Sequence, residues 1–415
     1  MHDQEAALEA DMEAAKRVDR GEDIALMEPM LVGESARRRG LLADLALELA
    51  ARAAGFRRSL PVGVRASLAT LVRAMNCYYS NLIEGHDTHP IDIERALNND
   101  YSTDRKKRDL QLEARAHITV QTWIDDGGLR GAAATRAGLI ETHRRFCALL
   151  PDDLLFIDHP DGGERVRVEP GALRTHDVAV GRHVAVSPGA LPRFLARFEQ
   201  AYARLGKIDA ILASAAAHHR FLWIHPFADG NGRVARLMSY AMQLDALETG
   251  GIWSIARGLA RNEAVYKQHL AACDLPRRND LDGRGALSEE SLCDFIAFFL
   301  KTCIDQVDFM ETLVEPNRLR QRMLLWAEEE VRGDRLPPGS GQVLEAVLFR
   351  GELPRMDAAM LLGASKRTAR RVTSALLDAG VLVSEGSRAP LRLAFPAALA
   401  GRWMPGLFPE KAGGE

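Results

Sequence analysis

Apolar residues recur every three or four positions along most of the chain, which is the spacing of one face of an α-helix. Glycine and proline residues separate the periodic segments, as they do where helices end. The pattern predicts helices over residues 37–55, 61–81, 108–124, 132–149, 192–205, 209–223, 233–247, 262–272 and 288–331. We therefore expect an all-α fold for the main body of the protein.

Two short segments follow a different period. In residues 165–168 and 177–186, apolar and polar side chains alternate around turn-forming residues, as in a β-strand with one buried face. We therefore predict a short β-hairpin in this region, ahead of the segment 225–236.

Glycine and proline concentrate in residues 333–341, which is typical of a linker between domains. Beyond it, the pattern predicts three short helices and two strands, over residues 343–349, 355–363, 365–380, 381–383 and 391–393. This order of elements resembles a winged helix-turn-helix domain, which we place at residues 342–405.

The overall charge is nearly balanced, with 54 lysine and arginine residues against 57 aspartate and glutamate residues. A balanced chain has no general affinity for polyanions, so contact with nucleic acid requires a local basic patch. Four basic residues cluster at the start of the predicted helix 365–380, namely Lys366, Arg367, Arg370 and Arg371. They make this domain a candidate for DNA binding, while protein docking or dimerisation is the alternative use of such a domain.

No feature of the sequence indicates secretion or a membrane. Residues 1–17 are acidic and lack the apolar core of a signal peptide, and no apolar run reaches the length of about eighteen residues that a spanning helix needs. The five cysteines show no CxxC spacing, which favours buried, reduced thiols. We therefore expect a cytoplasmic protein without membrane contact.

The chemically richest segment is 225–236, His-Pro-Phe-Ala-Asp-Gly-Asn-Gly-Arg-Val-Ala-Arg. Gly230 and Gly232, on either side of Asn231, let the backbone turn tightly with its N–H groups exposed, and a helix is expected to begin near Arg233. Exposed amides at the positive end of a helix dipole bind phosphate groups. The segment therefore predicts a site for a di- or triphosphate.

The charged side chains of this segment fit the same ligand. Arg233 and Arg236 are three positions apart, so they share a helix face and can both reach phosphate oxygens. Asp229 would repel phosphate unless a hard cation bridges the two, which implies Mg²⁺. His225 has a pKa near neutrality and suits the role of general base.

Other uses of the segment fit less well. Asp-Gly-Asn-Gly alone would also suit a solvent-exposed turn. A calcium loop would need an oxygen ligand where Arg233 stands and a glutamate where Tyr240 stands, and no GxxxxGK[ST] phosphate loop occurs.

The segment resembles the signature of the Fic family, HxFx[DE]GNGRxxR. Every specified position is matched, by His225, Phe227, Asp229, Gly230, Asn231, Gly232, Arg233 and Arg236. The resemblance implies a helical Fic core that transfers AMP from ATP to a serine, threonine or tyrosine of a protein. Upstream, residues 171–174 and 178–181 with Pro188 look like the family's flap hairpin, which holds the target segment by strand pairing.

By this resemblance His225 is the general base and Asp229 the Mg²⁺ ligand. The cradle of the α- and β-phosphates is formed by Gly230, Asn231 and Gly232, and the distal phosphates are held by Arg233 and Arg236. Downstream, Asn262, Tyr266 and residues 282–288 also look similar to the family, so the resemblance extends over roughly residues 30–315. Asn262 and Tyr266 are assigned to the nucleotide pocket, although a helix cap and a packed aromatic ring are the alternative interpretation.

Residues 80–85, Ser-Asn-Leu-Ile-Glu-Gly, close an apolar-periodic helix, and Gly85 is suited to end it. Ser80 and Glu84 lie on one face of that helix, and alone the segment would also suit an ordinary helix end. The string resembles the inhibitory helix [ST]xxxE[GN] of Fic proteins. The resemblance implies that Glu84 pairs with Arg236 and prevents ATP from binding in a reactive pose.

The sequence therefore predicts an ATP-dependent protein adenylyltransferase that Glu84 inhibits. Two alternatives stay open: removal of AMP from a modified protein, and a DNA-binding regulator whose Fic core senses a nucleotide. The expected partners are a protein substrate, which includes the chain itself, and DNA, and a homodimer is compatible with the sequence. The predicted parts are an N-terminal helical region with the inhibitory helix, a catalytic core with its helical extension, a linker and a winged-helix domain, over residues 1–110, 111–332, 333–341 and 342–405.

Overall fold

The computed structural model describes residues 18–157 and 165–409. Residues 1–17 lie outside these ranges. The prediction that they form no signal peptide therefore concerns residues that the structure does not describe. Most described residues are helical, which confirms the predicted all-α fold. The larger body contains α2 (Arg39–Ser59), α3 (Val62–Ile83), α4 (Pro90–Leu97), α5 (Arg105–Asp125), α6 (Arg136–Cys147), α7 (Leu191–Tyr202), α8 (Lys207–Ile224), α9 (Asn231–Leu247), α10 (Ala256–Arg261), α11 (Glu263–Cys273) and α12 (Glu289–Leu313), with 3₁₀ turns at Ile24–Met27, Asp152–Leu155 and Pro188–Ala190.

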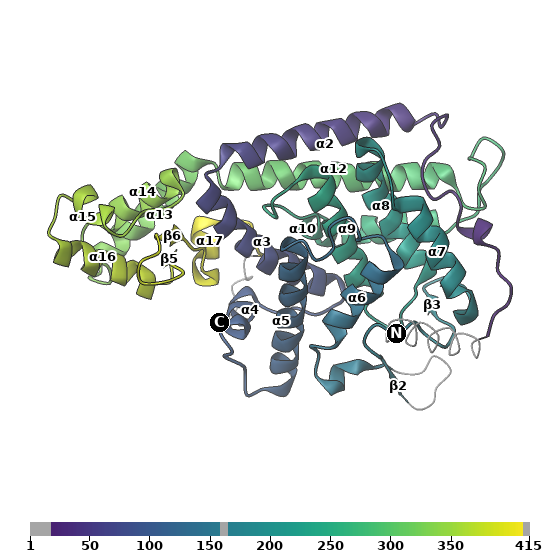
Figure 1. Cartoon of the computed structure of the whole chain (residues 1–415), viewed down its shortest axis with the longest axis horizontal. Helices are drawn as coiled ribbons and strands as arrows, with labels where there is room; N and C mark the ends of the chain where they lie inside the picture. The colour runs from purple at the N-terminus through teal and green to yellow at the C-terminus, as the bar shows by residue number, and fades with distance from the viewer. Residues whose placement is uncertain (1–17, 158–164, 410–415) are drawn as a thin grey trace, which may run out of the picture.

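Helices α8 and α9 form the centre of the body and pack against each other. From Ile211 onward, nearly every residue of α8 is buried, and most of α9 is buried as well. The long helices α2 and α12 run side by side along one edge of the molecule (Figure 1). A helix that is apolar on all sides belongs in the interior, so α8 fixes the position of the loop that follows it.

The single helix predicted over 288–331 is wrong, because the structure has two helices there. Helix α12 ends at Leu313 and α13 (Pro316–Arg332) begins three residues later. Proline cannot continue a helix but suits its first position. The Glu315 carboxylate accepts hydrogen bonds from the backbone N–H groups of Asn317 and Arg318, and so caps the new helix. The short helices α4 and α10 are additional to the prediction.

The predicted hairpin is also partly wrong. Strand β2 (Val166–Arg167) pairs with β1 (Phe156–Ile157), whereas β3 (Ala179–Val180) pairs with β4 (His183–Val184). Segments 165–168 and 177–186 thus belong to two separate ladders, since alternation along a strand does not specify its partner. The second ladder is a hairpin that turns at Gly181, whose φ is 62°.

The C-terminal part has the predicted order of elements: α14 (Ser340–Arg350), α15 (Asp357–Leu361), α16 (Lys366–Asp378), β5 (Leu382–Val383) and β6 (Arg392–Leu393), followed by α17 (Ala400–Trp403). It projects from one end of the body (Figure 1). Residues 333–339 form a turn in which Leu336 is buried, and α13 packs against α14. The segment predicted as a linker is therefore a folded turn. The winged-helix assignment and the domain limits stay predictions.

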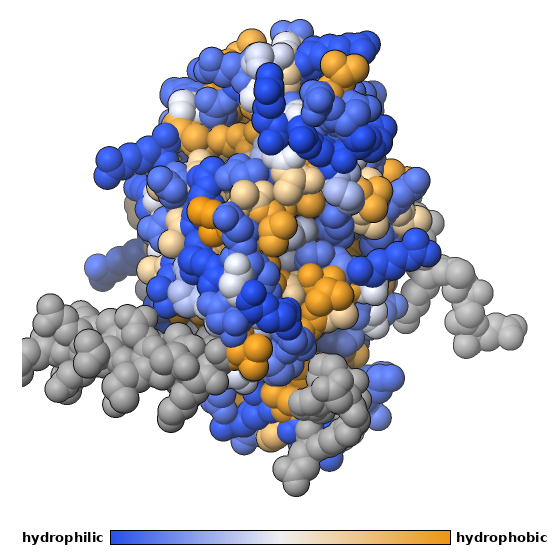
Figure 2. Space-filling model, turned by 90° about the vertical axis from the view of Figure 1, so that its right-hand side faces the viewer, coloured by the Kyte–Doolittle hydropathy of each residue, from blue (hydrophilic) through white to orange (hydrophobic). Residues whose placement is uncertain are grey.

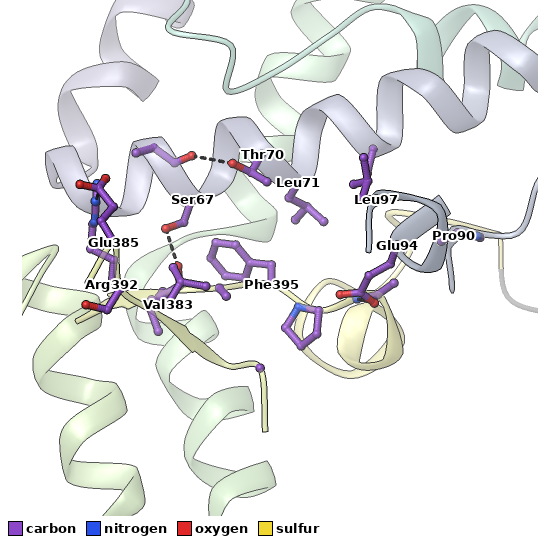
Figure 3. A pocket seen from close by; sticks show the side chains of 18 of the residues that line it. Ser67, Thr70, Leu71, Pro90, Glu94, Leu97, Val383, Glu385, Arg392 and Phe395 are labelled. Carbon is purple, nitrogen blue, oxygen red and sulfur yellow. Dashed lines mark hydrogen bonds and ion pairs between the residues drawn. The ribbon is translucent and has the colours of Figure 1, made fainter. Parts of the chain in front are cut away.

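The C-terminal part rests on α3. A Cβ atom added at Gly63 would lie 2.0 Å from the carbonyl oxygen of Gly351, so the two backbones touch. Further along α3, Ser67 donates a hydrogen bond to the Leu393 carbonyl, and the Tyr79 hydroxyl donates to the Leu407 carbonyl at 2.9 Å. Next to these contacts lies a cavity of about 450 Å³, which residues of α3, α4 and β6 line among others (Figure 3).

Two further features of the described residues concern the apolar length of the helices and the state of the cysteines. No helix in the described ranges is long and apolar enough to cross a membrane. The face drawn in Figure 2 mixes hydrophobic patches with hydrophilic side chains. All five cysteines are free and buried, as predicted.

Candidate functional site

The segment 225–236 forms the tight connection between α8 and α9. His225 ends α8 in the left-handed conformation, with φ 51° and ψ 60°, and Gly230 precedes α9 with φ 78°. The loop is held by the side chain of Asn231: its Oδ1 accepts from the Phe227 N–H at 3.0 Å, and its Nδ2 donates to the Phe227 carbonyl at 2.9 Å. The Asn231 side chain therefore shapes the loop, and an anion site made of the backbone N–H groups at the start of α9 stays a prediction.

The Glu84 carboxylate lies over the first turn of α9. A Cβ atom added at Gly232 would be 2.3 Å from Glu84 Oε1 and 3.2 Å from Arg236 Nη1. The carboxylate thus stands where the helix dipole and the free N–H groups favour an anion. Burial raises the pKa of Glu84, but attraction to Arg236 and Arg233 outweighs burial and lowers this pKa below its usual value.

Arg236 is held by the last turn of α3. Its Nε donates to Ser80 Oγ at 2.8 Å, and its Nη2 donates to the Ser80 carbonyl at 3.1 Å and to Glu84 Oε1. Gly85 follows α3 with φ 83°, which lets the chain turn away after Glu84. The structure therefore brings the predicted residues Ser80, Glu84 and Arg236 together.

Arg233 has partners that the sequence reasoning missed. Its Nη2 forms an ion pair with Glu113 Oε1 of α5, and Glu113 Oε2 lies 2.7 Å from His86 Nδ1. The Arg233 guanidinium also stands 5.4 Å from the ring centre of Phe146. Glu113 belongs to no short motif. The sequence could indicate its role only through the position of a carboxylate on the buried face of a predicted helix.

His225 is partly buried, and the loss of solvent around its ring lowers its pKa to about 4 and keeps the imidazole neutral at neutral pH. Its Nδ1 lies 3.3 Å from the Leu222 carbonyl oxygen. A proton on Nδ1 satisfies that carbonyl and leaves the Nε2 lone pair free, the arrangement that a general base needs.

Arg174 fixes the backbone around His225. Its Nε donates to the His225 carbonyl at 2.7 Å, its Nη1 to the His176 carbonyl at 2.9 Å and its Nη2 to the Val186 carbonyl at 2.5 Å. One guanidinium therefore joins the end of α8 to both sides of the β3–β4 hairpin. This contact helps to hold His225 in a backbone conformation that non-glycine residues rarely adopt.

Asp229 borders a small cavity of about 50 Å³, together with Gly230, Arg233, Glu113 and His86 among others. No group of three or more acidic, histidine or cysteine side chains in the described ranges forms a ready metal site. A lone carboxylate next to a phosphate site nevertheless suits Mg²⁺, which keeps several waters and takes phosphate oxygens as ligands.

The remaining candidates lie in two places. Asn262 donates to the Gly258 carbonyl at 2.9 Å between α10 and α11. The Tyr266 hydroxyl lies 2.6 Å from His218 Nε2, and burial raises the Tyr266 pKa to about 12. These contacts are those of a helix end and a packed aromatic ring, so a role in nucleotide binding stays a prediction. The four basic side chains of α16, Lys366, Arg367, Arg370 and Arg371, are exposed.

Residues 135–242 match the model of the Fic/DOC family. Protein adenylyltransferase Fic of Drosophila virilis is 28% identical over 171 residues, which are 41% of this chain and 32% of that protein. The same protein of Drosophila erecta is 27% identical over the same lengths. The matched region thus spans about a third of these relatives.

Solved structures of Fic proteins are also similar. A Fic family protein from Desulfovibrio desulfuricans G20 has 17% identity and a TM-score of 0.49, over 84% of this chain and 96% of that one. Fic-1 from C. elegans (aa134–508) has 16% identity and a TM-score of 0.46, over 66% of this chain and 73% of that one.

Proposed function

We propose that the Fic/DOC domain of this chain, residues 135–242, transfers AMP from ATP to a hydroxyl group of a protein, and that Glu84 inhibits the transfer. One observation carries the proposal: a carboxylate on the inhibitory helix occupies the anion position over Gly232 and holds Arg236 at the same time. Phosphate groups and a carboxylate compete for the same N–H groups and the same guanidinium.

The nucleotide is bound through its phosphates. The N–H groups at the start of α9 hold the phosphate next to the reacting one, and Arg233 and Arg236 neutralise the distal oxygens. Asp229 is the residue that would hold Mg²⁺, and the ion would supply further positive charge next to the phosphates.

The transfer requires one proton acceptor and one displaced group. His225 Nε2 takes the proton of the attacking serine, threonine or tyrosine hydroxyl. The hydroxyl oxygen forms a bond to the α-phosphorus, the bond between this phosphorus and the bridging oxygen breaks, and pyrophosphate leaves. The neutral state of His225 supports this role, because a protonated imidazole has no free lone pair.

The β3–β4 hairpin is suited to hold the target segment. Within residues 18–157 and 165–409 its ladder contains two strands, so the outer edges offer backbone N–H and carbonyl groups to an extended peptide. Val180 and Val184 are 49% and 65% exposed, and they would contact side chains of the target.

Intact-mass analysis of the purified Glu84→Gly variant with ATP and Mg²⁺ tests the function. We expect added AMP on the protein itself or on an offered protein pool, and much less with the unchanged protein. A Glu84→Gly variant that binds ATP but adds no AMP to any protein would refute the transferase. If the unchanged protein, with Glu84 in place, instead removes AMP from a modified protein, the site catalyses hydrolysis, in which water displaces the protein hydroxyl from the phosphorus of AMP.

We also propose that the C-terminal part binds DNA, because the four exposed basic residues of α16 stand at the start of one helix. Phosphate contacts of this kind weaken as salt rises. A salt-sensitive shift of duplex DNA in a gel is expected, and it should disappear when Lys366, Arg367, Arg370 and Arg371 are replaced by alanine. A shift that survives these replacements would contradict the assignment.

A further inference from the structure

The two arginines of α9 are bonded in different ways. Arg236 uses Nε and Nη2 on Ser80 and Glu84, so the inhibitory helix holds the edge of its guanidinium that these two nitrogens form. Arg233 uses Nη2 on Glu113, whereas its Nε is buried and has no hydrogen-bond partner in the described parts of the chain. A buried donor without a partner is costly and points to a ligand that completes it.

Glu113 is itself rigidly held. It lies in the middle of α5, its side chain is only 3% exposed, and its second oxygen lies 2.7 Å from His86 Nδ1. Phe146 stands beside the Arg233 guanidinium and limits where the guanidinium can move. The carboxylate therefore determines the orientation of Arg233.

We propose that Glu113 is a positioning residue that holds one edge of the Arg233 guanidinium and directs the other donors of Arg233 to a distal phosphate of the nucleotide. An arginine has five N–H donors in a fixed plane, so a carboxylate on one edge leaves others available. The proposal rests on the function above and adds a residue to it.

Glu113 differs in position from the inhibitory residue Glu84. Glu84 lies above Gly232 and bonds Arg236, whereas Glu113 lies on α5 and pairs with Arg233. Arg233, Glu113, Asp229 and Gly230 all border the same small cavity, so space next to Arg233 stays open. Glu113 thus orients this arginine without occupying the phosphate position.

Nucleotide selectivity tests the proposal without turnover. In the Glu84→Gly background, calorimetry measures the affinities for AMP, which has no distal phosphate, and for ADP. Glu113→Asp keeps the charge but withdraws the carboxylate by one methylene. We expect it to lower the preference for ADP over AMP by about ten-fold, the size of one charge-assisted hydrogen bond, while AMP affinity stays unchanged.

The controls separate positioning from general damage. Asp125, also on α5, pairs with Arg73 outside the site, and Asp125→Asn should leave the ADP preference unchanged. In an Arg233→Ala background, which lowers the preference by itself, Glu113→Asp should have no further effect. Thermal unfolding checks that each variant is folded, and Glu113→Gln is the second variant if Glu113→Asp is not.

An unchanged ADP preference in the Glu113 variants, with Arg233→Ala impaired, overturns the positioning role and leaves the transferase intact. An equal loss of AMP and ADP affinity also overturns it, because that result indicates a structural role. Absence of AMP transfer by the Glu84→Gly parent refutes the proposed function, and the binding experiment still decides the role of Glu113.

Discussion

Glu84 meets α9 at Gly232, the position of the first turn where the helix carries no side chain. The contact is close, because a Cβ atom at 232 would lie 2.3 Å from Glu84 Oε1. Under the proposed function, this position would serve two occupants that exclude each other, the Glu84 carboxylate and a phosphate. One ion pair between distant parts of the chain would then control nucleotide binding.

The Gly232→Ala variant tests whether a phosphate occupies the same position as the Glu84 carboxylate. The added methyl group displaces the flexible Glu84 side chain but also fills the phosphate position. We therefore expect this variant to stay inactive, unlike Glu84→Gly, and to bind ADP at least about ten-fold more weakly in the Glu84→Gly background. Calorimetry and intact mass measure both effects. An active Gly232→Ala variant would show that phosphate does not lie on this turn.

His225→Ala addresses the chemical step. In the Glu84→Gly background we expect the rate of AMP transfer to fall by roughly 10²–10⁴-fold, because the attacking hydroxyl loses its proton acceptor. ADP affinity should change little, since the phosphate contacts belong to α9. His89, which caps α4, offers a control: His89→Ala should keep the transfer rate. Transfer at the parent rate by His225→Ala would exclude His225 as the base.

Short contiguous motifs explain why much of this site was predictable. Ser80 and Glu84 lie in one hexapeptide and Arg236 in one dodecapeptide, so each carries its own signal. Glu113 carries none, because its role depends on α5 crossing α9, and chain spacing does not encode that crossing. The two hydrogen bonds between the Asn231 side chain and the Phe227 backbone could not be predicted either. A position in a sequence signature specifies a residue type and not the contacts that the residue makes.

The fold shows the same limit. Helical periodicity located the long helices, since each buries one face, but it joined α12 to α13 across Pro316 because the apolar spacing continues there. Alternation located β2, β3 and β4 but not β1, which left the pairing of β1 with β2 unforeseen. Local pattern determines the elements, and contacts between distant residues determine their arrangement.

The pH dependence of transfer follows from the burial of His225. Burial lowers its pKa from 6.5 to about 4, and only the neutral imidazole accepts the hydroxyl proton. The rate of the Glu84→Gly variant should therefore stay level as pH falls through 6.5 and decline only toward pH 4. Initial rates between pH 8 and 4, with ADP binding and circular dichroism at each pH, measure this. A half-maximal rate near pH 6.5 would mean that His225 is solvated when it reacts.

Arg174→Lys tests the link between His225 and the β3–β4 hairpin. A lysine has one nitrogen and cannot donate to the carbonyls of His225, His176 and Val186 from the positions that the guanidinium reaches. The His225 ring should then lose its fixed place, and we expect transfer to slow by about 10²-fold in the Glu84→Gly background. ADP affinity should stay unchanged, because α9 is not touched.

Arg182, in the turn of the same hairpin, provides the matched control. Its side chain is exposed, so Arg182→Lys should transfer AMP at the parent rate. If Arg174→Lys also keeps the parent rate while remaining folded, the three carbonyl contacts do not set the position of His225. If both lysine variants are slow, the hairpin needs its guanidinium groups for contacts other than those to His225, and the loss belongs to binding of the target protein. The two lysine variants together therefore distinguish positioning of the base from recognition of the target.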